Sequence, residues 1–163
     1  MADYFWDRPS ASWMISIDDP RNEDVRALLA RHLAFAGLHT PPEDVHALDV
    51  DGLLDPSVTF FSFRRDGELL GVAALKQLDD HHGEVKSMHT VQAARGRGIG
   101  RALLDHLLEV ARARGYRRVS LETGSMEAFA PARSLYTSAG FTPCGHFGDY
   151  DPSRNSTFMT LAV

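Results

Sequence analysis

The chain has 163 residues, of which 44% are hydrophobic and 24% are charged, and its formal net charge is −5. This length suits one domain with a hydrophobic core and is short for two, so we expect a single domain over residues 1–163. The acidic balance argues against broad attraction to nucleic acids or to anionic membranes. The only cysteine, Cys144, allows neither an intrachain disulfide nor a cysteine-rich metal site.

The N-terminal residues do not look like a targeting segment. Residues 1–11 lack the basic start and long apolar run of a signal peptide, and no stretch approaches the roughly 20 apolar residues that span a bilayer. We expect this segment to be irregular, with Tyr4, Phe5 and Trp6 packing on the domain or on a partner, such as a second copy in a homodimer. A cytoplasmic location is the expectation.

The first third of the chain predicts a strand, a helix and a long connection. Residues 12–17 have the pattern of a short strand, and Asp19-Pro20 resembles an N-cap followed by proline at the first helical position. Apolar residues then recur at helical spacing until Gly37, where we expect the helix to end. Residues 39–56 form a mixed connection with one short helix near residues 42–48.

The middle of the chain predicts antiparallel strands. Residues 58–64 are rich in Val, Thr and Phe, Asp66-Gly67 is a typical hairpin turn, and residues 69–78 run back. The sequence His81-His82-Gly83 predicts a second turn, which leads into a strand over residues 84–91.

The last part alternates helices and strands. Five apolar residues at helical spacing mark a helix that ends at Gly115: Leu103, Leu104, Leu107, Leu108 and Ala111. We expect a strand over residues 118–122, a helix over 131–139, and strands over 141–147 and 157–161. The order of elements over the whole chain predicts a mixed α/β fold.

A glycine-rich turn is the most informative motif. Arg95-Gly96-Arg97-Gly98-Ile99-Gly100-Arg101 lies between a predicted strand and the long helix. A helix N-terminus presents unpaired N–H groups and a partial positive charge, and glycines let the backbone approach a phosphate closely. Arginines add bidentate phosphate donors. The segment therefore predicts a pyrophosphate site.

Three other interpretations of this turn are weaker. A Walker A loop requires Gly-Lys-Ser/Thr, which is absent. A Rossmann fingerprint requires G-x-G-x-x-G, whereas the glycines here follow G-x-G-x-G, although Glu122 lies at the distance of that motif's acidic residue. An ordinary strand-to-helix turn often contains glycine, but it does not explain three glycines together with three arginines.

Through Arg95, Gly98 and Gly100, the turn resembles the R/Q-x-x-G-x-G/A acetyl-CoA signature of the GNAT acetyltransferase superfamily. Residues 132–141, ARSLYTSAGF, resemble the A-R-x-L-Y-x-x-x-G-F helix and strand of the same family. The resemblance covers about residues 58–161. Four shorter segments are similar to the bacterial YsnE-like GNAT proteins: HALD at 46–49, EVKSM at 84–88, LETGS at 121–125 and FAPAR at 129–133.

The resemblance implies the GNAT fold, a mostly antiparallel sheet that splays at the acetyl-CoA site and is flanked by helices. In this family the strand before the glycine turn binds the pantetheine arm through its backbone, and one of its N–H groups polarises the thioester carbonyl. Here these groups belong to Met88, His89 and Thr90. The pyrophosphate would be held by Arg95, Gly96, Arg97, Gly98, Ile99, Gly100 and Arg101.

The resemblance also implies two catalytic residues. Glu84 lies eleven residues before Arg95, where several relatives carry a general base for the amine, whose pKa near ~10 keeps it mostly protonated. A solvated glutamate at a strand start is the alternative. Tyr136 is the motif tyrosine that serves as general acid toward the CoA thiolate, the alternative being a packing role. Phe129 departs from the family, because many relatives have an asparagine that contacts the cofactor there.

The acceptor site has weaker indications. By period-two alternation Lys86 should share a strand face with Glu84 and Met88, where it would pair with Glu84, bind a substrate carboxylate or stay exposed. Four further residues lie in segments that would border an acceptor pocket: His39, His46, Tyr150 and Asp151.

The histidines and the cysteine do not predict further chemistry. Adjacent His81 and His82 lack the i, i+4 spacing of a helical ligand pair and have no carboxylate to complete a set, so we expect no metal site. Cys144 is most simply a packed strand residue.

The expected function is acetyl-CoA-dependent N-acetylation of a small amine or amino-acid-like acceptor by direct attack in a ternary complex. Acetyl-CoA would be a co-substrate, and neither nucleic acid nor membrane is an expected partner. Three alternatives remain: a non-catalytic acyl-CoA-binding or regulatory module, acetylation of a protein amine, and acetylation of an acceptor that is not an amine.

Overall fold

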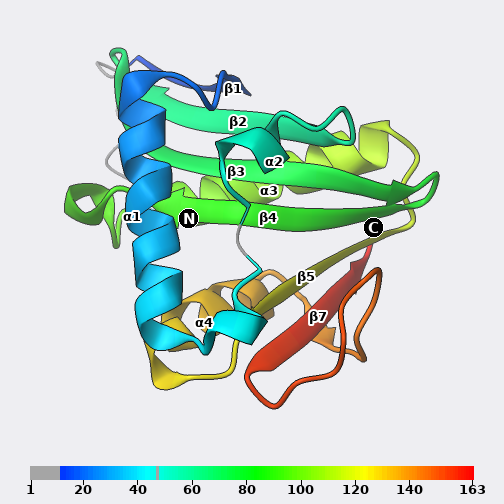
Figure 1. Cartoon of the computed structure of the whole chain (residues 1–163). Coiled ribbons are helices and arrows are strands. Elements are labelled where there is room, and N and C mark those ends of the chain that lie inside the picture. The colour runs from blue at the N-terminus through cyan, green and yellow to red at the C-terminus, as the bar shows by residue number, and fades with distance from the viewer. Residues whose placement is uncertain (1–11, 47) are drawn as a thin grey trace.

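The computed structural model describes residues 12–46 and 48–163, and our expectations for residues 1–11 lie outside this part of the chain. Seven strands form one sheet in the order β1-β2-β3-β4-β5-β7-β6 (Figure 1). The first four, each antiparallel to the next, are β1 (Trp13–Ile17), β2 (Val58–Arg65), β3 (Glu68–Asp79) and β4 (His82–Thr90). The expected mixed α/β fold with a mostly antiparallel sheet is confirmed.

Strands β4 and β5 (Arg118–Gly124) are parallel neighbours that soon part. They pair only where residues 82–84 lie beside residues 118–120. Beyond this point β5 stays paired along its other edge with β7 (Ser156–Ala162), and the facing edge of β4 has no partner strand in the described chain. In Figure 1, β5 and β7 run at an angle to β4. The splayed sheet that the resemblance implied is therefore present.

Helices cover both faces of the sheet. In Figure 1, α1 (Glu23–His39) crosses the front and α3 (Ile99–Ala113) lies behind. The short α2 (Val50–Leu53) lies on the α1 face, and α4 (Ala130–Ser138) packs on the α3 face. No helix in the two described ranges is long and apolar enough to cross a membrane.

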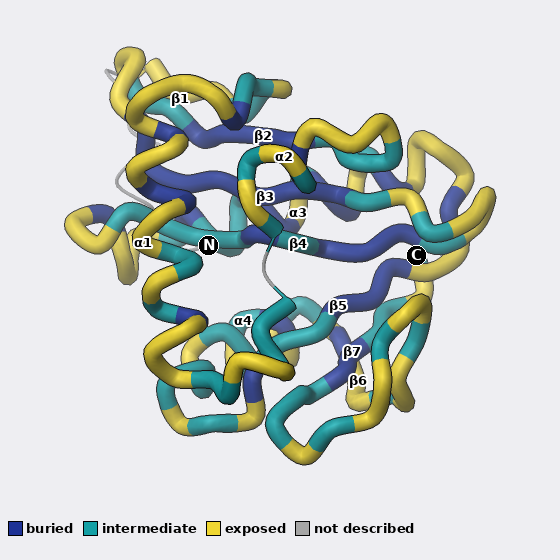
Figure 2. Tube along the Cα trace, viewed as in Figure 1, coloured by how far each residue is buried: buried dark blue, intermediate teal, exposed yellow. Residues whose placement is uncertain are grey.

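Strand alternation creates two hydrophobic cores, because successive side chains point to opposite faces. On β3, Val72 and Ala74 pack with α1 residues, whereas Ala73 and Leu75 pack with α3 residues. The central strands are consequently buried on both faces (Figure 2). The α1 contribution comes from Val25, Leu28 and Leu29 at helical spacing, each at most 1% exposed. Burial of each such side chain is worth about 1.5–3 kcal/mol.

Helix α1 differs from the sequence prediction at both ends. It begins at Glu23 after Asn22, because Asp19 instead closes a turn by accepting hydrogen bonds from the backbone and guanidinium of Arg21. It continues through Gly37 to His39, since Gly37 does not adopt a positive φ. The following connection contains a 3₁₀ turn over Pro42–Asp44 and then α2, rather than one helix near residues 42–48.

Two strand boundaries also differ. His82 and Gly83 belong to β4, because they pair with Asp79 and Gln77 of β3. The final hairpin strand β6 covers only Thr142–Pro143 rather than residues 141–147. Proline donates no ladder hydrogen bond, and beyond it the Cys144 N–H still donates to the Phe158 carbonyl of β7 at 2.9 Å although the strand itself has ended.

A β-bulge in β4 changes the direction of its side chains. Lys86 pairs with Ala74 and His89 with Val72, so Ser87 and Met88 together oppose a single residue of β3. Ser87 has a φ of 53°, which is uncommon for a residue with a side chain. Lys86 and His89 therefore both lie on the α1 face, whereas Met88 packs in the α3 core. The prediction that Lys86 shares a face with Glu84 is correct, and its extension to Met88 is wrong.

Candidate active site

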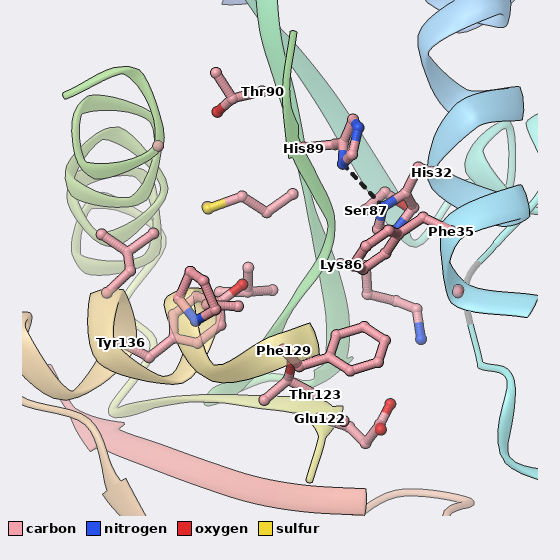
Figure 3. A pocket seen from close by; sticks show the side chains of 18 of the residues that line it. His32, Phe35, Lys86, Ser87, His89, Thr90, Glu122, Thr123, Phe129 and Tyr136 are labelled. Atoms are coloured by element: carbon pink, nitrogen blue, oxygen red, sulfur yellow. Dashed lines mark hydrogen bonds between the residues drawn. The ribbon is translucent and has the colours of Figure 1, made fainter. Parts of the chain in front are cut away.

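A cavity of about 600 Å³ lies where β4 and β5 part. Its walls come from β4, β5, α1, the start of α3, η4 (Glu127–Phe129) with α4, and the segment around Asp44 and His46. Figure 3 shows labelled side chains of α1, β4, β5, η4 and α4 around it. One continuous space therefore joins the glycine-rich turn to the carboxylates of β4 and β5.

The glycine-rich turn forms the N-terminus of α3 at one end of the cavity. Gly98 is the N-cap with φ 86° and ψ 8°, and no described side chain caps the helix. The first helical hydrogen bond runs from the Ala102 N–H to the Gly98 carbonyl at 3.0 Å, so the N–H groups of residues 99–101 have no acceptor within the helix. This geometry suits an anion.

Six of the seven residues predicted to hold a pyrophosphate line the cavity: Arg95, Gly96, Gly98, Ile99, Gly100 and Arg101. Arg97, the seventh, does not belong to the lining. Arg101 also contacts its own helix, since its Nε lies 3.0 Å from an oxygen of Asp105.

Met88, His89 and Thr90 of β4, the predicted pantetheine-binding residues, line the cavity, and a second histidine joins them. Nδ1 of His89 lies 3.3 Å from Nδ1 of His32 on α1 (Figure 3). Burial lowers the pKa of His89 to about 4, with the positive charges around it adding to the effect, and burial also lowers the pKa of His32. Both rings are therefore neutral at pH 7. The sequence analysis did not identify His32, because this residue belongs to none of the recognised motifs.

Glu84, Lys86 and Tyr150 form a buried polar network. Glu84 is 2% exposed, and its Oε2 accepts hydrogen bonds from the Tyr150 hydroxyl and from Lys86 Nζ, the latter at 3.3 Å. Lys86 Nζ also lies 2.8 Å from the Tyr150 hydroxyl oxygen. Burial, together with the charge of Glu84, raises the pKa of Tyr150, so Tyr150 remains a donor. Of the three alternatives for Lys86, the pairing with Glu84 is the one found.

Glu122 on β5 is a site residue that sequence reasoning missed. It lines the cavity, and its carboxylate and Lys86 point toward one another (Figure 3). The pKa of Glu122 is raised to about 7, chiefly by burial; the charges of Glu84 and Asp44 add to this effect, and Ser156 and Lys86 oppose it. The sequence singled out Glu122 only as part of LETGS and by its distance from the glycine turn, and neither signal shows its burial, which depends on segments distant in sequence.

Tyr136 on α4 lines the cavity and is 7% exposed. Burial raises its pKa to about 12, with the charge of Glu122 contributing. Its ring packs against Phe141 with the centroids 5.9 Å apart. The side chain thus has a packing contact and also faces the cavity (Figure 3).

Phe129 fills space between β5 and α1. A Cβ on Gly124 would lie 2.3 Å from its ring, so only glycine fits beneath it. Its other side makes an edge contact with Phe35 of α1, with the centroids 5.4 Å apart. Arg133 holds the adjoining loop, because its Nη1 donates to the carbonyls of Gly124 at 2.7 Å and Met126 at 2.8 Å.

The weaker acceptor-site predictions have mixed outcomes. His46 and Tyr150 line the cavity with their rings in edge contact, 4.9 Å between centroids. His39 does not line it and instead packs on Phe35, and Asp151 is also outside the lining. Within residues 12–46 and 48–163, no group of three or more His, Cys, Asp or Glu side chains is arranged to hold a metal.

Comparisons with known proteins agree on one family. The family model described as Acetyltransferase (GNAT) family matches residues 10–141. The chain is 47% identical over 146 residues to the uncharacterized N-acetyltransferase YsnE of Bacillus subtilis, covering 90% of this chain and 97% of that protein.

Two solved structures have the same fold. A candidate acyl-CoA N-acyltransferase from Klebsiella pneumoniae superposes with a TM-score of 0.78 at 28% identity, covering 92% of this chain and 97% of that one. A Bacillus subtilis acetyltransferase, solved in complex with CoA, superposes with a TM-score of 0.69 at 19% identity, covering 93% of this chain and 99% of that one.

Proposed function

This chain belongs to the GNAT family of N-acetyltransferases and resembles its bacterial YsnE-like members, and we propose that it transfers the acetyl group of acetyl-CoA to a small primary amine. The observation that carries this proposal is one continuous cavity that extends from the N-terminus of α3 along the unpaired edge of β4 to Glu84 and Glu122. CoA bound to a neighbour of the same fold supports it.

The cofactor would bind mainly through backbone groups. The N–H groups at the start of α3, with Arg95 and Arg101 beside them, suit the pyrophosphate. The β4 edge beyond Glu84 has no strand partner in the described chain, so its N–H and C=O groups can pair with the pantetheine amides as an added strand would. One N–H in the Met88–Thr90 stretch would polarise the thioester carbonyl and stabilise the oxyanion.

Two carboxylates are candidates for taking the amine proton. Glu122 is our first choice, because a pKa of about 7 makes it half ionised at neutral pH and basic enough to accept a proton. Glu84, which the family motif indicates, is the second. Its Oε2 already accepts two hydrogen bonds, from Tyr150 and Lys86, which reduces its availability.

Tyr136 would assist the departing thiolate. Its pKa of about 12 keeps it a phenol at neutral pH, so its O–H can donate a hydrogen bond to sulfur. Full proton transfer to a thiolate with a conjugate-acid pKa of roughly 8.5 would be uphill. We therefore assign Tyr136 mainly as a donor that stabilises developing charge, with the final proton coming from the amine through the carboxylate and water.

Direct transfer in a ternary complex fits the residues better than an acyl-enzyme. Cys144 is the only cysteine, it is outside the cavity lining, and burial raises its pKa. In direct transfer the amine nitrogen forms a bond to the thioester carbon, the C–S bond breaks, and the nitrogen loses one proton.

Calorimetry with acetyl-CoA, followed by initial-rate kinetics, tests the proposal. We expect saturable binding that weakens about tenfold or more in Arg95→Ala, from loss of a charge-assisted contact. Arg112→Ala, at the opposite end of α3, is the matched control. Double-reciprocal plots should intersect. Parallel lines would indicate an acyl-enzyme, and binding without acceptor-dependent thiol release would favour a non-catalytic acyl-CoA-binding module.

A further inference from the structure

We propose that the preferred acceptor is an amine with a second cationic group, such as an aliphatic diamine or polyamine, rather than an amino acid. This inference rests on the proposed acetyl transfer and concerns the acceptor end of the cavity, defined by Asp44, His46, Glu84, Lys86, Glu122 and Tyr150. Its grounds are the balance of charge there, an unpartnered buried hydroxyl and the aromatic walls.

The acceptor end has no available cation for a substrate carboxylate. Lys86 is the only lysine or arginine among the described residues that define it, and its side chain is 9% exposed. Its ammonium is neutralised by Glu84 at 3.3 Å and hydrogen-bonded to Tyr150 at 2.8 Å. A ligand carboxylate would have to break this buried pair and leave Glu84 uncompensated, which is costly.

Two further carboxylates leave this end acidic. Glu122 faces Lys86 (Figure 3), and the charges of Glu84 and Asp44 both act on it. Asp44 accepts hydrogen bonds from Ser153 and Asn155, each at 3.0 Å, and these bonds lower its pKa, so that it is ionised at neutral pH. Glu84 balances the Lys86 ammonium, so the ionised Asp44 and the partly ionised Glu122 are left uncompensated, and a cationic group on the ligand besides the reacting amine would compensate them.

An unpartnered hydroxyl indicates that a ligand completes the site. Ser87 is 7% exposed, its Oγ has no hydrogen-bond partner among the described residues, and it lines the cavity next to His32 (Figure 3). A buried hydroxyl without a partner destabilises the fold, and a φ of 53° adds backbone strain. An amine N–H donated to this oxygen would remove the first cost.

Aromatic rings provide the remaining wall. Phe35 and Phe129 lie on one side and His46 with Tyr150 on another. Ring faces accept both methylene groups and ammonium groups. An alkyl chain with an amine at each end offers both methylene groups and ammonium groups to these rings, and it carries no anionic group.

Three acceptors with four carbons each test the inference: putrescine, butylamine and γ-aminobutyrate, in which the carbon farthest from the reacting amine carries an ammonium, is a methyl group or is a carboxylate. We expect kcat/KM with putrescine to exceed that with butylamine by about fivefold to tenfold, and γ-aminobutyrate to be poorest. In Asp44→Asn the preference for putrescine over butylamine should shrink toward unity. In Asp51→Asn, an exposed carboxylate of α2 outside the cavity, it should stay unchanged.

Equal or better use of γ-aminobutyrate, or of butylamine, would overturn the diamine inference and leave the acetyltransferase intact. No transfer to any of the three would also overturn it, and calorimetry with acetyl-CoA in the same samples would then report separately on the proposed function. Because the three-acceptor comparison uses the wild-type protein, it holds even where a variant folds poorly.

Discussion

Nδ1 of His32 on α1 lies 3.3 Å from Nδ1 of His89 on β4, and this contact joins the helix to the strand beside the cavity. One neutral ring donates its N–H and the other accepts it. Protonation of both rings would remove the acceptor and create repulsion. The pair therefore connects the pH of the solution to the packing of α1.

We expect protonation of this histidine pair to lower the free energy of unfolding at acid pH. The pKa of His89 falls from 6.5 to about 4 on folding, so the unfolded chain binds more protons between these values. The free energy of unfolding that depends on neutral His89 is therefore highest above pH 6.5, and it decreases as the pH falls toward 4. Urea midpoints measured across this range should show a shallower acid loss in His89→Gln. His81→Gln, an exposed turn residue, is the control, and an equal slope in both variants would contradict the prediction.

Glu122→Gln should have opposite effects on stability and on activity. The native pKa of about 7 exceeds the ordinary 4.5, so the native chain binds the proton more tightly and stability falls as the pH rises from 4.5 to about 7. At pH 8 the glutamine variant should be more stable, on the order of 1 kcal/mol, while both are alike at pH 4. Thermal melts at the two pH values measure this.

The same variant should lose about 100-fold or more in kcat/KM, and the wild-type rate should rise with pH through 7. Glu127→Gln removes an exposed carboxylate outside the cavity and should leave both properties unchanged. A large loss in Glu84→Gln with little loss in Glu122→Gln would instead assign the proton acceptor to Glu84.

Tyr136→Phe should lower kcat by about 10–100-fold with little change in the affinity for acetyl-CoA, because only the developing thiolate needs its hydroxyl. Tyr116→Phe is a matched control, since that hydroxyl is buried in the α3 core without a partner among the described residues. Its removal should leave turnover unchanged and stabilise the fold slightly. Wild-type turnover in Tyr136→Phe would reduce this tyrosine to a packing role.

Gly124→Ala should destabilise the fold by about 1–3 kcal/mol, because the new methyl group would overlap the Phe129 ring. In a Phe129→Ala background the same change should cost far less, and this double-mutant cycle isolates the contact. Gly37→Ala, in a helix with nothing within 4 Å of the added carbon, should instead be neutral or stabilising. Additive losses in the double variant would show that the ring does not constrain residue 124.

The fold was largely predictable because its signals are local. Alternation along β3 and helical spacing in α3 identify the two faces of the sheet, and the glycines of the turn mark the start of α3. One error came from a local signal that the structure overrides, since Gly37 stays helical. Another came from a local signal that the prediction did not weigh, since the strand ends at Pro143.

The site was only partly predictable, since its chemistry depends on contacts between distant segments. The Ser87 bulge becomes evident only through the register with β3, and it separates Met88 from Lys86. The raised pKa of Glu122 comes from burial by surrounding elements, and His32 matters because α1 brings it to β4. None of these features has a motif of its own.

Acceptor-dependent release of CoA thiol is the most direct test of the proposed acetyl transfer. Purified protein with acetyl-CoA should release thiol only when an amine from a panel is added, and mass spectrometry of that amine should detect one added acetyl group per thiol released. Acetyl-CoA that binds but is never consumed with any amine, or thiol release that occurs equally without an acceptor, would contradict it.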